Sequence, residues 1–505
     1  MGRKTNQATT SIKTKNSNKK NKTPKEEREL LDAVDNLLRL TTLPIHNNLP
    51  HALECQRQII SYLDRIRIVE DKLLRKQNKV STNNNTTEST VQTRLSQDVI
   101  QNFTKWMKEN GGELHGCSIS SFDEYDLGIK VDQDIDQSSL VIAVPRKVMM
   151  SVEVAAKSVI KDLINKVEIL KNMPNVLLSI YLLVEKFSPN SFWKPYFDIL
   201  PKTYSTVLYF TQNDLEELKG SPTLEVALRQ IKSIVRQYAY FHKLFWNSDD
   251  PVCELMRSKF SFHEYCWAVS TVMTRQNMIP SEDGSTMINS LIPLWDMCNH
   301  SNGTISTDYN PQLDRSESLA FRDFKAGEQL FIFYGPRTNS DFFIHNGFVY
   351  NENENDLYWI RLGISKSDPL QEKRKELLNK LGIWSTAEFS IKKGPRPVDG
   401  RLLAFLRVFN MDADQLEHWL ESDKSSDLQY QECGLETSLE LKSWAFLKAR
   451  LNLLLSSYKT TLEEDQKLLS AKKIGNNMRT AIKMRLCEKT ILRDCLNYVD
   501  EMIQK

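Results

Sequence analysis

Closely spaced cysteines are missing from this sequence. Its eight cysteines are scattered, and none forms the C-x-x-C spacing that zinc sites and redox motifs use. We therefore expect no bound metal, and free thiols in a reducing compartment. Long apolar runs are missing too, since no stretch approaches the ~18 uncharged residues that a membrane-spanning helix needs. The polar start lacks the apolar core of a secretory signal. These absences predict a cytoplasmic protein, with the nucleus as a second location, and no membrane contact.

An excess of charge of one sign is missing as well. The chain has 67 Lys and Arg against 65 Asp and Glu, and the basic surplus sits in residues 1–28. A folded nucleic-acid-binding domain usually carries a clustered basic stripe, so we expect no nucleic-acid partner. Residues 1–28 have too few apolar side chains to offset chain entropy, which predicts a disordered basic tail. A nuclear-import signal or a patch for an acidic partner is the alternative for this tail.

Apolar periodicity divides the remaining chain, which is too long for one hydrophobic core at 505 residues. Helical spacing dominates from residue 25 to about 79 and must break near Pro44 and Pro50. A polar low-complexity stretch at 80–92 then predicts a linker. We therefore expect a helical N-terminal segment with its linker at 29–92, after the tail.

The next segment, 93–350, combines strands and helices. Short apolar runs between turn residues predict strands at 114–119, 127–131 and 139–145. Helical patterns fill most of 150–245, and a second group of strands is expected within 292–334. This order predicts an α+β domain of short β-sheets with a helical insertion. Leu-rich stripes at helical spacing then predict an all-α second domain at 351–505.

Three local clusters carry the residues of chemical interest. Residues 124–129 (EYDLGI) form a turn that enters a strand. Residues 294–300 (LWDMCNH) end an apolar run in an Asn-His pair. Residues 326–335 (AGEQLFIFYG) place a tyrosine at the end of a buried strand. Each cluster alone also has a purely structural interpretation. The first can be an ordinary turn, the second a turn whose histidine is hydrogen-bonded locally, and the third a packed tyrosine whose hydroxyl reaches solvent.

Taken in this order and spacing, the three clusters resemble the SET-domain methyltransferases. The missing cysteine-rich flanks, the helical insertion and the helical second domain resemble the branch similar to the Rubisco large-subunit methyltransferase. Longer segments between residues 98 and 491 look like the actin-histidine N-methyltransferase family: SPNSFWKPYFDILP (188–201), VRQYAYFHK (235–243), WAVSTVMTRQN (267–277), LIPLWDMCNH (291–300), FIFYGPR (331–337) and LLAFLRVF (402–409).

This resemblance implies an enzyme that uses S-adenosyl-L-methionine to methylate a histidine of actin. The fold that it implies is a SET domain followed by a substrate-binding domain of the Rubisco methyltransferase type. We expect a monomer that binds its actin substrate as an extended peptide in a groove. An imidazole is largely neutral at physiological pH, so it needs the correct tautomer more than a strong base.

By resemblance, Asn277 and Tyr334 are the catalytic residues. Asn277 would engage the far nitrogen of the imidazole, and Tyr334 would lie near the point of methyl transfer. From the residues alone, Asn277 could instead cap the preceding helix. Further substrate contacts are implied for a pocket wall and for residues flanking the peptide: Trp295, Ile332, Arg337, Arg236 and Tyr309.

The resemblance also implies a set of cofactor contacts. They comprise Arg94, Glu124, Tyr125, Asp126, Leu127, Asn299, His300, Tyr334, Asn346 and Phe348. Within this set, Phe348 would stack on the adenine. Three positions depart from the family. A Gly-Phe-Gly-type loop reads Asp126-Leu127-Gly128 here, and Asn346 replaces a serine. The expected arginine position holds Ser96 without a gap, and Arg94 is the nearest candidate.

Two other functions compete with histidine methylation. One is a protein-lysine methyltransferase of the same fold, and the other is a non-catalytic module that binds actin. Lysine-specific relatives typically carry an aromatic residue at the position of Asn277, which argues against the first. Tyr334, Asn277, Asn299 and His300 together argue against the second.

Overall fold

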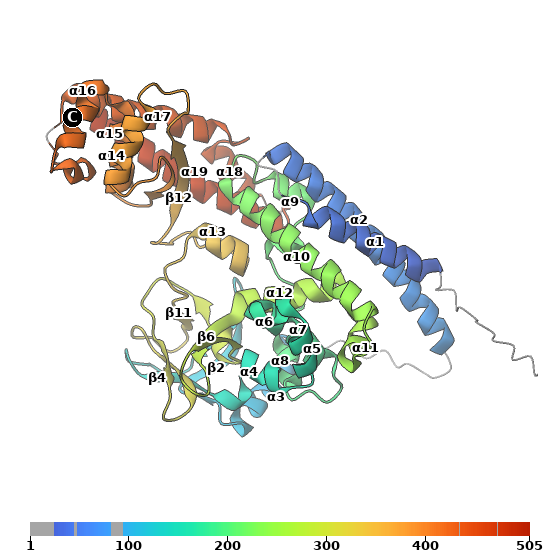
Figure 1. Cartoon of the computed structure of the whole chain (residues 1–505). Coiled ribbons are helices and arrows are strands. Elements are labelled where there is room, and N and C mark those ends of the chain that lie inside the picture. The colour runs from blue at the N-terminus through green and yellow to red at the C-terminus, as the bar shows by residue number, and fades with distance from the viewer. Residues whose placement is uncertain (1–24, 45–47, 82–93, 434, 472, 505) are drawn as a thin grey trace, which may run out of the picture.

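Two hydrophobic cores organise the chain, which the computed structural model describes at residues 25–44, 48–81, 94–433, 435–471 and 473–504. The first core takes residues from Leu30 to Ile344 together with Ala481 and Met484, and the second takes residues from Tyr358 to Val499. Figure 1 shows the body around the second core, in orange and red, beside the larger first body. The predicted α+β class is confirmed.

The N-terminal helices α1 (Lys25–Thr42) and α2 (Leu49–Ser81) pack against α10 (Pro222–Trp246) and share the first core (Figure 1). The predicted break between them is confirmed, and Pro50 lies in the first turn of α2, where its missing N–H costs nothing. Residues 25–28 were expected in the disordered tail, which is wrong. They belong to α1, whose first turn carries acidic residues that suit a helix N-terminus. Residues 80 and 81 of the predicted linker (80–92) belong to α2. The rest of that linker and residues 1–24 of the predicted tail lie outside the described residues.

Three small sheets form the β part of the first body. Their strand orders are β1-β4-β10-β9, β2-β3-β11-β8 and β5-β7-β6. The strands are β1 (Glu113–Leu114), β2 (Cys117–Phe122), β3 (Asp126–Val131), β4 (Leu140–Pro145), β5 (Met150–Ser151), β6 (Gln276–Pro280), β7 (Met287–Leu291), β8 (Asn299–His300), β9 (Thr307–Asn310), β10 (Arg315–Leu319) and β11 (Gln329–Ile332). The strands expected at 114–145 and within 292–334 are confirmed. The pair β6–β7 lies in a stretch for which no strand was expected.

The parallel pairing of β8 with β11 matters most for the site. It sets Asn299 beside Phe331 and His300 beside Ile332, although these residues lie about 30 positions apart in the chain. The antiparallel partner of β11 is β3, which begins at Asp126. One sheet therefore gathers all three clusters of the sequence at one place.

Helices of the first body lie mainly between β5 and β6, as the predicted insertion. The helical elements are α3 (Gln97–Glu109), η1 (Arg146–Val148), α4 (Val152–Lys157), α5 (Lys161–Lys166), α6 (Glu168–Asn172), α7 (Pro174–Phe187), α8 (Lys194–Ile199), η2 (Val207–Tyr209), α9 (Gln212–Glu216), α10, α11 (Pro251–Arg257), α12 (Phe262–Arg275), η3 (Trp295–Met297), α13 (Asn339–Asp341) and the π-helical turn η4 (Phe342–Asn346).

The second body is not all-α, which corrects one expectation. Strands β12 (Leu357–Gly363) and β13 (Thr386–Lys392) form an antiparallel pair. Tyr358, Ile360 and Leu362 are buried while the residues between them are exposed, a period of two that is typical of a strand. The helical elements are α14 (Gln371–Lys380), α15 (Gly400–Asn410), α16 (Ala413–Glu421), η5 (Ser425–Gln429), α17 (Thr437–Ser456), α18 (Leu462–Ser470) and α19 (Asn476–Gln504).

The last helix, α19, belongs to both cores. Ala481 and Met484 in its first half pack in the first core, while Leu492 and Val499 in its second half pack in the second. The two bodies are therefore joined by a continuous helix as well as by the chain at residues 350–356. Among the described helices, none has a stretch that is long and apolar enough to span a bilayer.

Candidate active site

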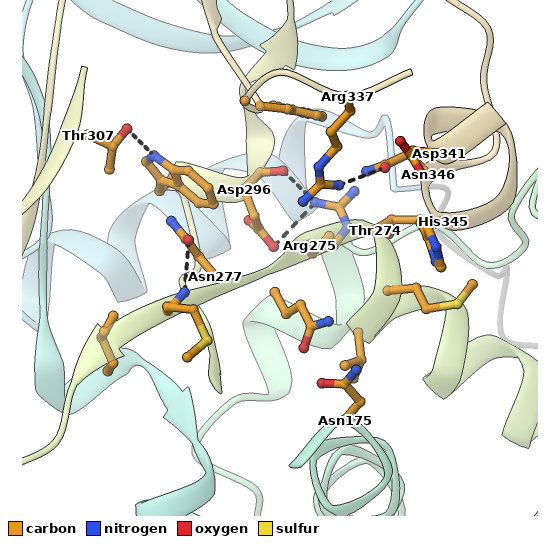
Figure 2. A pocket seen from close by; sticks show the side chains of 18 of the residues that line it. Asn175, Thr274, Arg275, Asn277, Asp296, Thr307, Arg337, Asp341, His345 and Asn346 are labelled. Atoms are coloured by element: carbon orange, nitrogen blue, oxygen red, sulfur yellow. Dashed lines mark hydrogen bonds and ion pairs between the residues drawn. The ribbon is translucent and has the colours of Figure 1, made fainter. Parts of the chain in front are cut away.

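An open cavity of about 900 Å³ lies between the insertion helices and the small sheets. Helices α7, α10 and α12 form one side, while β6, β9, β11 and the turn at η3 form the other. Figure 2 shows side chains from both sides of this cavity. Seven residues expected at the site line it: Asn277, Trp295, Tyr309, Ile332, Tyr334, Arg337 and Asn346.

Asn277 is positioned by a strand and not by a helix end. Helix α12 ends at Arg275 with Gln276 as its C-cap, and Asn277 follows in β6, where it pairs with Ser290. The helix-cap interpretation is therefore wrong. Its Oδ1 accepts a hydrogen bond from the backbone N–H of Met278 at 2.8 Å (Figure 2). A carboxamide oxygen has two lone pairs, so Oδ1 can accept a second hydrogen bond from a ligand.

A strained turn presents Trp295 to the cavity. Leu294, which precedes it, has a φ of +74°, in the left-handed region that non-glycine residues rarely adopt. Such strain persists where the surroundings enforce it, and it is common at functional sites. The Trp295 indole N–H donates to Thr307 Oγ1 at 3.0 Å, which fixes the ring as part of the wall (Figure 2).

Tyr334 connects the cavity to the residues expected to bind the cofactor. Its hydroxyl donates to the backbone carbonyl of Cys298 at 2.7 Å, and its own backbone N–H donates to His300 Nδ1 at 3.2 Å. Burial raises the pKa of the phenol well above its ordinary value. The hydroxyl is therefore neutral and has a fixed orientation. It lies between the cavity and the residues expected to bind the cofactor.

Asn299 and Gly128 form a close contact on the cofactor side. Asn299 Nδ2 donates to the Leu127 carbonyl at 3.1 Å and to Gln329 Oε1 at 2.7 Å. A Cβ placed on Gly128 would lie 2.8 Å from that Gln329 oxygen and 3.0 Å from Asn299 Nδ2. Gly128 is thus required by close approach, and it holds the 124–127 turn against β8.

His300 lies among aromatic rings next to this contact. Its ring centre lies 5.1 Å from that of Tyr334 and 6.2 Å from that of Phe348. Burial lowers the pKa of His300 to about 4, so the ring is neutral at physiological pH. Since Nδ1 accepts the Tyr334 N–H, the proton is on Nε2, which is buried and has no partner among the described residues. A donor of this kind suits a site that receives a polar ligand.

Arg94 reaches the same region from the start of α3. Its Nη1 forms an ion pair with Asp126 Oδ2 at 2.7 Å, and its Nε donates to the Ile199 carbonyl at 3.0 Å. Ser96 instead caps α3 by accepting from the Val99 N–H. Tyr125 packs edge-on against Phe331, and Glu124 is exposed in the turn. Geometry therefore brings Arg94, and not Ser96, to the turn at 124–127.

Peptide contacts were also expected at the cavity rim. Tyr309 donates to Asp314 Oδ1 at 2.7 Å, and Arg337 Nη1 donates to Asn346 Oδ1 at 3.1 Å. The structure does not bring Arg236 to the cavity. It is exposed on α10, whereas its neighbour Gln237 lines the wall, because successive helix residues point about 100° apart.

Sequence reasoning missed a buried polar cluster that forms part of the cavity wall. Arg275 Nη1 donates to the Asp296 carbonyl at 2.7 Å and lies 3.3 Å from Asp296 Oδ2 (Figure 2). The same Oδ2 also accepts from the Tyr196 hydroxyl at 2.5 Å. Burial raises the pKa of the Asp296 carboxyl, against the opposing effect of Arg275. All three residues lie in the segments that carry the family resemblance, but they are up to 100 positions apart, so no local pattern joins them.

A second missed feature is a row of carboxamides on the opposite wall. Asn289 Nδ2 donates to Asn175 Oδ1 at 3.0 Å and to Gln276 Oε1 at 2.9 Å. Asn175 and Gln276 line the cavity, as does Gln237. These neutral groups can donate to and accept from a peptide backbone.

Two family models and several curated relatives match this chain. The SET domain model matches residues 126–335, and the Rubisco LSMT substrate-binding model matches 365–492. Actin-histidine N-methyltransferases of Gallus gallus and Homo sapiens are each 42% identical to it, over 78% of this chain and 67% of theirs. The Xenopus tropicalis protein is 43% identical over 79% of this chain and 69% of its own. The chain belongs to the actin-histidine N-methyltransferase family.

Solved structures show the same fold. The SET domain of LSMT bound to lysine and AdoHcy aligns with a TM-score of 0.66 at 22% identity, covering 80% of this chain and 92% of its own. Rubisco LSMT bound to AdoMet aligns with a TM-score of 0.62 at 23% identity over the same shares. The expected branch of SET-domain proteins, with its substrate-binding domain, is thereby confirmed for this member of the actin-histidine N-methyltransferase family.

Proposed function

We propose that this protein transfers a methyl group from S-adenosyl-L-methionine to a histidine of actin. The observation that carries the proposal is the position of Asn277, whose free acceptor capacity faces the same cavity as Tyr334. Family membership supports the reaction and the substrate. We also propose that the protein acts as a monomer in the cytoplasm and also in the nucleus, and that it has no nucleic-acid partner.

The residues of the cofactor cluster fit S-adenosyl-L-methionine. This cofactor supplies a methyl group bound to a positively charged sulfur. Arg94 offers a guanidinium for a carboxylate, Phe348 offers an aromatic face for adenine, and His300 has a buried N–H without a partner. Asn346, which pairs with Arg337 at the rim, can hydrogen bond to the same molecule from the cavity side.

Asn277 would select the reactive tautomer of the substrate imidazole. Its Oδ1 can accept the N–H of the far ring nitrogen while it keeps the bond from Met278. The other ring nitrogen then carries the lone pair that attacks the methyl carbon. Trp295 and Ile332 would hold the ring plane, which matters because an in-line displacement depends on alignment more than on acid-base power.

Tyr334 would orient the reacting groups without exchanging a proton. Its hydroxyl proton is committed to the Cys298 carbonyl, and the raised pKa keeps the phenol neutral. The lone pairs of the phenolic oxygen are left to contact the electron-poor methyl hydrogens. Tyr334 would thereby favour the in-line arrangement of the imidazole nitrogen, the methyl carbon and the sulfur.

The test is methyl transfer from labelled S-adenosyl-L-methionine to purified actin, with the modified residue located by mass spectrometry. Label on one actin histidine, absent when that histidine is replaced by alanine, is the expected result. Label on a lysine would overturn the assignment of Asn277 and favour a lysine methyltransferase. Tight actin binding without any label would favour a non-catalytic binding module.

A further inference from the structure

A buried carboxyl group joins the two bodies through residues that do not line the cavity. Glu488 of α19 has only 3% of its surface exposed. Its Oε1 accepts from Ser221 Oγ and Thr223 Oγ1, each at 2.8 Å, and its Oε2 accepts from the Tyr458 hydroxyl at 2.9 Å. Ser221 is the N-cap of α10 in the first body, whereas Tyr458 follows α17 in the second. We call these four residues the Glu488 joint.

Contacts around the joint leave little room for the bodies to rotate. Arg485, which lies one turn earlier on α19, donates to the Glu217 carbonyl at 2.8 Å and pairs with Asp465 at 2.7 Å. A Cβ on Gly220 would lie only 2.5 Å from the Ser457 carbonyl oxygen, so the two backbones touch. Arg485 and Asp465 are almost fully buried. The junction is therefore tightly packed, and its hydrogen bonds and ion pairs favour one relative orientation of the two bodies.

Helix α10 leads from the joint to the cavity. Its first turn is held by Glu488, and farther along it Gln230, Ser233 and Gln237 line the cavity wall. Thr223 Oγ1 also lies 3.0 Å from Ser340 Oγ in α13, next to Asp341 on the cavity rim. A change in the joint would thus alter the angle between the second body and the cavity.

Buried ionisable groups are a costly way to join two surfaces. Apolar residues of similar volume often stabilise a protein as well or better, whereas hydrogen bonds to a buried carboxyl group fix one relative orientation. The second body matches the substrate-binding family model, so its orientation determines where a docked protein meets the cavity. A short peptide, in contrast, needs the cavity alone.

We propose that the Glu488 joint is a positioning element for intact protein substrates. It holds the second body at the angle at which a folded substrate docked there presents its target side chain to Asn277 and Tyr334. The inference rests on the proposed function, because it presumes a protein substrate. It adds that methylation of a folded protein and methylation of a peptide depend differently on residues that do not line the cavity.

The test compares kcat/KM for intact actin and for a short peptide that contains the methylated histidine. Glu488→Ala and Thr223→Val should lower kcat/KM for actin about tenfold, mainly through KM, because small misplacements remote from the chemistry are costly. Both variants should stay within about twofold of the parent on the peptide. Glu488→Gln should retain activity on actin, since an amide can accept from both hydroxyls and donate to the Tyr458 oxygen.

Glu440→Ala provides a matched control. Glu440 pairs with the buried Arg407 at 2.7 Å within the second body and does not touch the joint. It should lower the melting temperature without changing the ratio of kcat/KM for actin to kcat/KM for the peptide.

Equal losses of kcat/KM on both substrates, or no loss in Thr223→Val, would overturn the inference. Thr223→Val keeps the Ser221 and Tyr458 bonds, so it decides the matter if Glu488→Ala fails to fold. A parent enzyme that labels neither substrate would instead contradict the proposed function.

Discussion

The phenolic oxygen of Tyr334 lies 2.7 Å from the backbone carbonyl oxygen of Cys298, to which it donates its proton. The backbone N–H of the same tyrosine donates to His300 Nδ1. One residue thus links the substrate cavity to the proposed cofactor cluster through two hydrogen bonds of different origin. Its ring is therefore positioned by contacts to the segment Cys298–His300, and not by β11, which already ends at Ile332.

Removing the Tyr334 hydroxyl should affect rate more than stability. Tyr334→Phe keeps the ring packing but loses the bond to Cys298 and the oxygen lone pairs, so kcat should fall by about 10- to 100-fold. Single-turnover kinetics would measure the loss. Tyr181→Phe, which removes a buried hydroxyl in α7, should leave kcat unchanged. Equal kcat in Tyr334→Phe and the parent would show that the hydroxyl has no role in transfer.

Replacing Asn277 should change the preferred nucleophile. Asn277→Phe removes the acceptor for the imidazole N–H and narrows the cavity, so kcat/KM for the histidine peptide should fall at least about tenfold. An aromatic wall suits an aliphatic amine, so a peptide with lysine in place of the histidine should gain relative to it. Competition assays with mass spectrometry would give the ratio. Unchanged histidine turnover would contradict the proposed role of Asn277.

Activity on a histidine peptide, which needs the cavity alone, should depend on pH through the substrate and not through the enzyme. Burial lowers the pKa of His300 to about 4 and raises that of Tyr334, so neither group changes charge between pH 5.5 and 8.5. The substrate imidazole has an ordinary pKa of about 6.5 and attacks only when neutral. A plot of kcat/KM should rise through pH 6.5 and then stay level. A falling limb below pH 8.5 would indicate a titrating group in the enzyme.

The free energy of unfolding should fall as pH rises, because Glu70 keeps its proton to a higher pH in the folded protein than in the unfolded one. Burial raises the pKa of Glu70 in α2 to about 7, although the Tyr238 hydroxyl donates to it at 3.2 Å. The folded state therefore keeps a proton that the unfolded state releases near pH 4.5. The contribution is fully present below that pH and is lost as pH rises through 7.

Glu70→Gln keeps the neutral form at every pH. The free energy of unfolding of Glu70→Gln minus that of the parent should therefore rise by about 2 kcal/mol from pH 5.5 to pH 8. Urea titrations at the two pH values would measure this difference. If the parent and Glu70→Gln show the same pH dependence, Glu70 is already ionised in the folded protein at pH 5.5.

Much of the site was visible in the sequence as short motifs. The turn at 124–129, the Asn-His pair and Tyr334 lie in the three clusters, and the structure brings the clusters together through the pairing of β3, β11 and β8, with Tyr334 just after β11. The exposed position of Arg236 was not visible in the sequence, because the side of α10 that lines the cavity depends on what packs against it. The strand pair β12–β13 was missed although its alternation of buried and exposed residues is local.

The sequence by itself determined the family, the helical insertion, the break between α1 and α2, and the identity of the motif residues. The family follows from segments that resemble known members, whereas the other features depend on side-chain periods of two and 3.6 and on neighbours a few positions away. Only the tertiary structure decided that Asn277 belongs to a strand, that Arg94 and not Ser96 meets the turn, and that Arg275, Asp296 and Tyr196 form one cluster. It also decided that α19 enters both cores. Such contacts join residues from 13 positions apart, for Asn277 and Ser290, to 267 positions apart, for Ser221 and Glu488, and no local pattern encodes which distant partner fills a given space.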